Sequence, residues 1–308
     1  MMTVLRRLAG PAVLLLAAVA VPGCGSAPAP VPGVAGGFGT DPVITIPNGK
    51  PSPDMIVKTV IPGHGPVIGP GDYVLVNVQG KVWAGDREVV DSYTDRQPQG
   101  LPLRSPSALP AWRRLAGQRV GSRVLMVVPP RDGFGRRGDP QANVMGTDTL
   151  VFVFDLLGAM REKAHARGTV VPYHAGPGLP RVGWGSRGPV ITPPAAARPP
   201  ATLTRRILVR GDGPPVRKGQ TVVVQYTGVV WRTGQTFDSS WARGFPESFL
   251  LGAGQVIPGW ERGLAGVPVG SRVLLVLPPG LGYGQAGDPP DVDGHDTLIF
   301  VVDILAAL

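Results

Sequence analysis

Alternating apolar and polar positions near the C-terminus predict a β-strand over residues 222–227. One face would carry Val222, Val224 and Tyr226, and the other Val223, Gln225 and Thr227. The apolar runs 273–277 and 298–305 predict two more strands, and Ile257, Trp260 and Leu264 recur at helical spacing between them. The pattern therefore predicts an α+β domain, in which an antiparallel sheet is wrapped around one short α-helix.

The same pattern occurs twice along the chain, at an offset of about 148 positions. Residues 63–66 (GHGP) return as 211–214 (GDGP), 119–124 (RVGSRV) return near 268–273 (PVGSRV), and 148–152 (DTLVF) return as 296–300 (DTLIF). A repeat of this length indicates two tandem domains rather than a solenoid, whose repeats are much shorter.

The N-terminus has the features of an export signal. Arg6 and Arg7 precede an apolar run over residues 12–21, which is too short to span a bilayer comfortably. Residues 21–24 (VPGC) resemble a bacterial lipobox, in which Cys24 would be lipidated. We therefore expect anchoring to the extracytoplasmic face of the cell membrane. An ordinary secretory signal would instead give a secreted protein with Cys24 incidental.

These patterns predict five segments along the chain. The segment after Cys24 carries few large apolar residues to bury and cannot offset the entropy cost of ordering, so we expect a flexible tether. Residues 159–182 contain Arg161, Glu162, Lys163 and a cluster of glycines and prolines, which is typical of a linker. The predicted division is 1–23 signal peptide, 24–36 flexible tether, 37–158 first domain with an N-terminal arm, 159–182 linker, and 183–308 second domain with an arm and a core of 203–308.

Composition excludes several classes of function. The formal net charge is +9, but the arginines are scattered and form no basic stripe with interleaved aromatic residues, so we expect no nucleic-acid partner. The four histidines lack the spacing of metal ligands, and Cys24 is the only cysteine, so neither a metal site nor an internal disulfide is expected. We also expect no cofactor, and a monomer.

Two further motif classes carry no support. Three Gly-x-Gly-x-x-Gly matches begin at Gly133, Gly183 and Gly282, but no helical pattern follows them, as a dinucleotide site requires. No Gly-x-Ser-x-Gly sequence is present. Turn glycines in β-rich domains explain the three matches.

An aromatic block in the second copy carries a family resemblance. Residues 226–228 (YTG), 237–240 (FDSS), 256–260 (VIPGW), 283–284 (YG) and 297–300 (TLIF) occur in an order that resembles the FKBP-type peptidyl-prolyl cis-trans isomerases over about 203–308. The resemblance implies catalytic roles for Tyr226, Phe237, Asp238, Ile257, Trp260, Tyr283 and Phe300, and substrate contacts from Arg243, Val256 and Val292. It implies binding of proline-containing unfolded or folding polypeptides and of macrolide ligands.

The two copies differ at these positions. Val78, Val90 and Phe134 of the first copy align with Tyr226, Phe237 and Tyr283, whereas Asp91, Arg96, Val144 and Phe152 match their counterparts. Glu247 and Asp288 of the second copy depart from the residues common in the family. We therefore predict isomerase activity in the C-terminal domain, acting on exported polypeptides. The alternative is a non-catalytic polypeptide-binding chaperone or envelope module that uses the same pockets.

Overall fold

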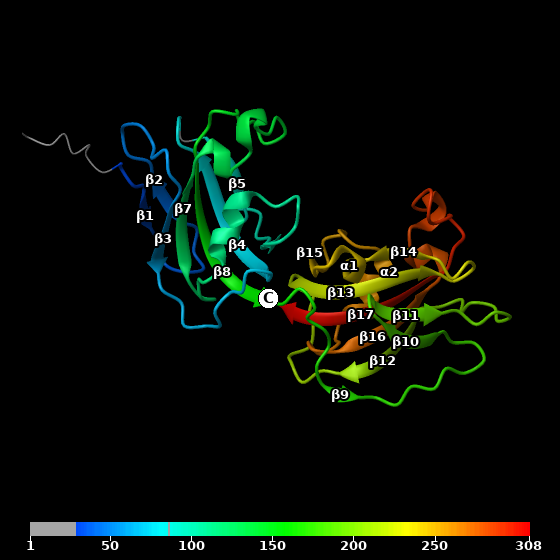
Figure 1. Cartoon of the computed structure of the whole chain (residues 1–308). Coiled ribbons are helices and arrows are strands. Elements are labelled where there is room, and N and C mark those ends of the chain that lie inside the picture. The colour runs from blue at the N-terminus through cyan, green and yellow to red at the C-terminus, as the bar shows by residue number, and fades with distance from the viewer. Residues whose placement is uncertain (1–28, 86) are drawn as a thin grey trace, which may run out of the picture.

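The chain forms two β-rich domains, and the C-terminus lies between them (Figure 1). The computed structural model describes residues 29–85 and 87–308. The predicted signal peptide and Cys24 lie outside the described residues. Within the described part of the chain, no helix is long and apolar enough to cross a membrane.

The first domain is built on an antiparallel six-stranded sheet. Its main path runs in the order β3-β7-β8-β4-β5, and β6 pairs with the N-terminal half of β4. The strands are β3 (Ile56–Ile61), β4 (Tyr73–Val82), β5 (Glu88–Asp91), β6 (Gln99–Pro102), β7 (Arg123–Val128) and β8 (Leu150–Met160).

The second domain repeats this arrangement with one extra edge strand. Its path is β14-β13-β17-β16-β12-β9, and β15 pairs with β13. The strands are β9 (Thr169–Val170), β12 (Thr204–Arg210), β13 (Thr221–Val230), β14 (Thr236–Ser239), β15 (Glu247–Leu250), β16 (Arg272–Leu277) and β17 (Leu298–Ala307). Since β9 lies within the predicted linker 159–182, part of that segment belongs to the second sheet.

Each sheet is preceded by a β-hairpin arm. The first arm pairs β1 (Gly33–Ala35) with β2 (Val43–Thr45), and the second pairs β10 (Arg181–Gly185) with β11 (Gly188–Thr192). The expectation of a flexible tether over 24–36 is wrong for residues 33–35. The reason is that β1 gains backbone partners in β2 and Val34 packs against a buried cluster around Trp83.

One helix lies across each sheet, as the sequence predicts, but the two helices differ in type. Helix α2 (Pro258–Leu264) of the second domain is α-helical, whereas its counterpart η1 (Pro110–Leu115) is a 3-10 helix. The first copy is one residue shorter in this segment, which matches the tighter 3-10 winding. The remaining short helices are α1 (Ser240–Arg243), η2 (Pro130–Asp132), η3 (Gly135–Arg137), η4 (Pro279–Leu281) and η5 (Gly284–Ala286).

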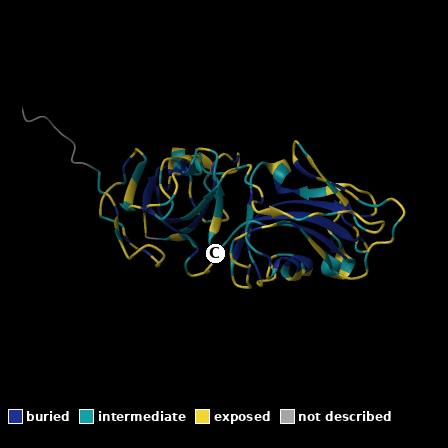
Figure 2. Ribbon diagram, turned by 90° about the horizontal axis from the view of Figure 1, so that it is seen from below, coloured by how far each residue is buried: buried dark blue, intermediate teal, exposed yellow. Residues whose placement is uncertain are grey.

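Both faces of each sheet are buried, so the strands form the dark interior of each domain in Figure 2. In the second domain, Tyr226 and Val224 of β13 face α2, whereas Val229 packs with Ile191 of the arm on the opposite face. This confirms the predicted period of two along β13. The face that packs against α2 carries the aromatic block.

The two domains meet through an apolar contact and several hydrogen bonds. Tyr73 and Leu75 of β4 pack with Val223 of β13 and with Phe245 and Leu305. Three hydrogen bonds donated by side chains join the described parts of these segments: Tyr73 Oη to Ser248 Oγ at 2.8 Å, Gln97 Nε2 to Gln255 Oε1 at 3.0 Å, and Gln225 Nε2 to the carbonyl of Glu162 at 2.8 Å. The N–H of Ala166 also donates to Asp303 Oδ2 at 2.8 Å.

Candidate functional site

A cavity of about 380 Å³ opens between α2 and the concave face of the second sheet. Its walls come from β13, β14, β15, β17 and the segments before α2 and η5. The lining residues are Tyr226, Asp238, Glu247, Ser248, Phe249, Gln255, Val256, Ile257, Trp260, Tyr283 and Phe300.

Aromatic rings form the base of this cavity. The Trp260 ring lies edge-on to Tyr226 at 4.9 Å and to Phe300 at 5.3 Å between centroids, and it tilts against Phe249 at 5.3 Å. Edge-to-face contacts at these distances are favourable for aromatic rings. The indole is therefore fixed on three sides, and Trp260 is only 5% exposed.

Gly228 makes this packing possible. A Cβ atom at position 228 would lie 2.7 Å from Phe300 and 2.8 Å from Phe237, which is closer than van der Waals contact allows. The Phe237 ring consequently packs edge-on to Phe300 at 5.5 Å and lies 6.3 Å from Tyr283. Phe237 thus supports the cavity from behind Phe300 and Tyr283.

Four polar side chains form a network at the cavity edge. The Tyr226 hydroxyl donates to Asp238, and Arg243 donates to Asp238 and, at 2.8 Å, to the Tyr226 oxygen. Arg243 also pairs with Glu247 at 2.5 Å. Burial, the hydrogen bond to Asp238 and the nearby charge of Glu247 raise the pKa of Tyr226 well above its ordinary value. Tyr226 therefore stays protonated and holds its carboxylate partners in place.

Buried hydroxyl groups fix the strand that carries Tyr226. The backbone N–H of Tyr226 donates to Ser240 Oγ at 2.8 Å, and Ser240 Oγ donates to Gln225 Oε1 at 2.5 Å. Ser239 caps α1 by accepting from the N–H of Ala242. In the sequence FDSS (residues 237–240), the phenylalanine therefore lies behind the cavity and the aspartate at its edge. The two serines hold the backbone beneath it through hydrogen bonds.

Several hydrogen-bond donors at the cavity have no acceptor among the described residues, including the buried indole Nε1 of Trp260. Neither the backbone N–H of Ile257 nor the hydroxyl of Tyr283 has an acceptor among residues 29–85 and 87–308. Burial and the charges of Asp288 and Asp238 raise the pKa of Tyr283. Its hydroxyl therefore remains a donor at neutral pH. Both groups can bind carbonyl oxygens of a ligand in the cavity.

The structure brings most of the predicted site residues together. Tyr226, Asp238, Val256, Ile257, Trp260, Tyr283 and Phe300 line the cavity, whereas Phe237 and Arg243 lie directly behind or beside these residues. Val292 does not line the cavity. It is 1% exposed and packs in the core, because residues 288–292 fold back through a bridge between Asp288 and Val292.

Sequence reasoning missed three lining residues. Ser248, Phe249 and Gln255 line the cavity, but they fall in no motif of the aromatic block. The signal for Phe249 was its place opposite Val222 in the sheet, which only the register of β15 reveals. No signal in the sequence identified Gln255, because it lies in the irregular segment between β15 and α2, where no periodic pattern indicates which way a side chain points.

The matching position in the first domain is built differently. Asp91 does not pair with Arg96 in the described structure; its carboxylate instead accepts the N–H groups of Tyr93 and Thr94 and the Thr94 hydroxyl. The Trp112 ring packs edge-on against Phe152 at 4.9 Å and against Phe154 at 5.1 Å. Phe154 aligns with Val302, so a second ring fills space beneath Trp112.

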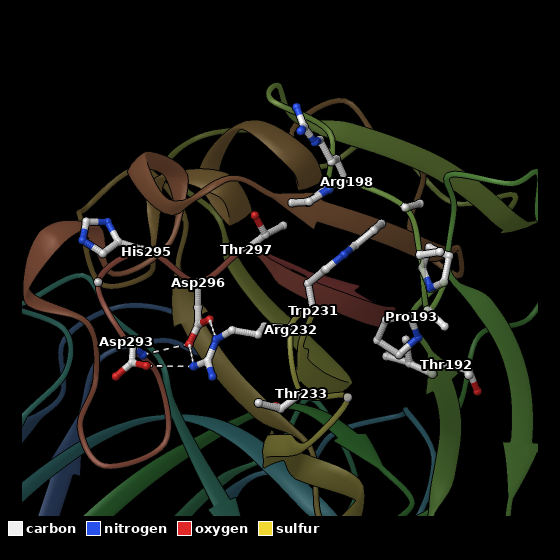
Figure 3. A pocket seen from close by; sticks show the side chains of 18 residues that line it. Thr192, Pro193, Arg198, Trp231, Arg232, Thr233, Asp293, His295, Asp296 and Thr297 are labelled. Atoms are coloured by element: carbon white, nitrogen blue, oxygen red, sulfur yellow. Dashed lines mark hydrogen bonds and ion pairs between the residues drawn. The ribbon is translucent and has the colours of Figure 1, made fainter.

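A larger cavity of about 1200 Å³ lies on the opposite face of the second sheet (Figure 3). Its walls are the proline-rich segment 193–199, Trp231 and the loop 293–297. Arg232 is held there by Asp293 at 2.7 Å and by Asp296 at 3.0 Å. Trp231 belongs to the buried cluster that packs against the arm, whereas Trp260 of the aromatic cavity belongs to the cluster on the other face of the sheet. Within the described ranges no cluster of His, Cys, Asp and Glu could hold a metal ion.

Comparison with known families agrees with this geometry. The family model described as FKBP-type peptidyl-prolyl cis-trans isomerase matches residues 65–157 and 213–305, one match in each domain. The chain belongs to this family. The FKBP-type family is a family of isomerases, and the fold prediction made from the sequence is thereby confirmed.

Each match to an individual relative is about as long as one FKBP-type domain. An FK506-binding protein of Streptomyces anulatus is 49% identical over 109 residues, which is 35% of this chain and 88% of that protein. A probable FK506-binding protein of Corynebacterium glutamicum is 39% identical over 119 residues, 39% of this chain and 98% of that protein. The peptidyl-prolyl cis-trans isomerase FKBP15-2 of Arabidopsis thaliana is 48% identical over 89 residues, which is 29% of this chain and 54% of that protein. This match therefore spans about half of the relative. The crystal structure of FkpA from Escherichia coli is 35% identical, covers 41% of this chain and 51% of that chain, and has a TM-score of 0.32.

Proposed function

We propose that the second domain catalyses cis–trans isomerisation of X–Pro bonds in polypeptides. The observation that carries this proposal is the aromatic cavity with two unused donors at its edge, Ile257 N–H and Tyr283 Oη. A proline ring would lie on Trp260, and the flanking carbonyl groups would accept hydrogen bonds from the two donors.

The chemistry of the bond fits an apolar site. Rotation about the peptide bond must break amide resonance, against a barrier of about 18–20 kcal/mol. The twisted transition state has less charge separation than the planar amide, so a cavity that removes water favours it over the ground state. No proton needs to be transferred, which agrees with a site that holds its tyrosines protonated.

The polar network supports the reaction indirectly. Asp238 accepts hydrogen bonds from Tyr226 and Arg243, so its charge is held at a fixed place beside the cavity. A fixed carboxylate can repel the substrate carbonyl oxygen from its planar position. We expect this contribution to be smaller than that of desolvation, because Asp238 is partly solvated and already paired.

We assign the activity to the second domain alone. The first domain lacks both of the aromatic side chains that stand at positions 226 and 237 and the hydroxyl at position 283. The carboxylate of its aspartate, Asp91, accepts hydrogen bonds from backbone N–H groups within a local turn. We propose that this domain positions its neighbour and contributes binding surface.

The substrates that we propose are exported polypeptides with exposed proline residues. This rests on the N-terminal sequence, in which Cys24 would anchor the protein to the extracytoplasmic face of the membrane. The names of the relatives also suggest macrolide binding in the aromatic cavity. Glu247, which is paired with Arg243 at the edge, would weaken the contact with an apolar macrolide.

The test is a proline isomerisation assay on the mature full-length protein with a chromogenic proline tetrapeptide. We expect acceleration over the uncatalysed rate, a loss of at least tenfold in kcat/KM for Phe237→Ala, and no change for the matched first-domain variant Val90→Ala. Binding of the peptide without acceleration would overturn the isomerase proposal and favour the chaperone alternative.

A further inference from the structure

A second groove lies between the two domains, beside the aromatic cavity. It has a volume of about 360 Å³ and is bordered by residues 97–102 of the first domain and by residues 245–248 of the second. Glu247 and Ser248 line both this groove and the aromatic cavity. The two hollows therefore adjoin along β15.

Both walls of this groove are edge strands. Among the strands that the structure describes, β15 pairs only with β13, and β6 pairs only with β4. The N–H of Leu250 donates to the side chain of Gln255 at 3.0 Å, so it points away from β13. The opposite residue, Thr221, exchanges both backbone hydrogen bonds with Leu308 instead, which confirms this orientation.

Ser248 consequently presents free backbone groups to the groove. Backbone groups of residues two apart in a strand point to the same side, so the N–H and C=O of Ser248 point away from β13 like those of Leu250. Among the described residues neither group has a partner. Such an unpaired edge can accept an additional strand.

Hydrogen bonds between the domains join the two walls of the groove. The Tyr73 hydroxyl donates to Ser248 Oγ, and Gln97 donates to Gln255. Gly100 of β6 is essential for the first contact, because a Cβ at this position would lie 1.6 Å from the Tyr73 oxygen. The Tyr73 hydroxyl therefore reaches Ser248 only because residue 100 has no side chain.

We propose that this groove binds the extended polypeptide that flanks the target proline, through backbone hydrogen bonds to the edge of β15. The occupant is a segment of the same polypeptide whose proline occupies the aromatic cavity, since Glu247 and Ser248 border both. The walls carry prolines and glutamines and no cluster of charges, so recognition is of backbone rather than of sequence. The inference rests on the proposed function and adds that long substrates are preferred over short ones.

The test compares three labelled probes on the full-length protein: a proline tetrapeptide, a twelve-residue peptide that contains it, and the same twelve-residue peptide with N-methylated flanking amides. N-methylation removes the donors that a paired strand needs and leaves the proline unit unchanged. By fluorescence anisotropy we expect the unmodified long peptide to bind about tenfold more tightly than either other probe. Equal affinity of the methylated and unmodified long peptides would overturn the inference.

A variant pair checks the contribution of the first domain. Gly100→Ala displaces Tyr73 and should remove the tenfold difference in affinity between the unmodified and the methylated long peptide. Gly37→Ala is the matched control, because a Cβ at position 37 meets nothing within 4 Å. Absence of tetrapeptide turnover would contradict the proposed isomerase activity. The difference in affinity between the two long peptides tests the groove independently of turnover.

Discussion

Arg123 and Asp155 form a two-pronged ion pair in which neither side chain is exposed to solvent. Arg123 Nε and Nη2 each donate to the carboxylate at 2.7 Å, and Nη1 donates to the carbonyl of Gly36 in the arm at 3.0 Å. Arg272 and Asp303 repeat the pair in the second domain, with the Trp184 ring of the second arm 4.0 Å from the guanidinium. One buried pair thus anchors each arm to its sheet.

Removing one partner of the fully buried pair should be costly. We expect Asp155→Ala to lower the free energy of unfolding of the first domain by about 3–5 kcal/mol, because it leaves an arginine without a charge partner in the core. Asp303→Ala should cost less, since the Arg272 side chain is 17% exposed and can be hydrated. Urea unfolding of the two variants checks this, and a larger loss for Asp303→Ala would contradict the burial argument.

The two tyrosines of the aromatic cavity should separate function from stability. Tyr283 donates to no protein group, so Tyr283→Phe should lower kcat/KM about three- to tenfold, the equivalent of one hydrogen bond, without changing the urea midpoint. Tyr226→Phe should lower both, because it removes a buried donor to Asp238. The isomerisation assay and urea unfolding measure the two quantities. A stability loss for Tyr283→Phe as large as that for Tyr226→Phe would refute the distinction.

The sequence predicted the parts of the site that depend on local pattern. The period of two along 222–227 placed Tyr226 on the concave face, and helical spacing placed Trp260 above it. The order of the motifs, through the family resemblance, then identified most of the remaining residues of the site. Ser248 and Gln255 could not be predicted in this way, because their place depends on the register of β15 and on a neighbouring domain.

The first arm and Val292 also could not be predicted from local sequence pattern. Pairing of β1 with β2 becomes favourable only when Val34 can pack against the sheet, which no local pattern reveals. Val292 matched a family position, yet the fold-back at residues 288–292 buries it beneath the loop. Long-range packing therefore decides which of the motif residues reach the cavity.

The contact between Tyr73 and Ser248 should give an alkaline dependence of stability. Burial raises the pKa of Tyr73 to about 12, with the hydrogen bond to Ser248 opposing the rise and the charge of Glu247 adding to it. In the unfolded chain its pKa is about 10, so the folded state binds the proton more tightly. The stabilisation is fully present below about pH 10 and is lost as the pH rises through about 12.

Tyr73→Phe tests this linkage. The variant should be less stable than wild type by about 1 kcal/mol at pH 8, the value of one hydrogen bond, but its stability should fall less steeply between about pH 10 and 12. Urea unfolding at several pH values measures both. Parallel pH profiles of wild type and variant would show that the Tyr73 pKa is not raised by folding.

The two equivalent aspartates should have separate roles. Asp238 faces the cavity and holds Tyr226 and Arg243, so we expect Asp238→Ala to lower kcat/KM about tenfold in the full-length protein. Asp91 only caps the turn at Tyr93 and Thr94, so Asp91→Ala should lower the unfolding free energy by about 1 kcal/mol and leave kcat/KM unchanged. Proline isomerisation and urea unfolding of the pair measure both effects. If Asp91→Ala lowered kcat/KM as much as Asp238→Ala, the first domain would have to share the activity, because the hydrogen-bond partners of Asp91 in the described structure all belong to the first domain.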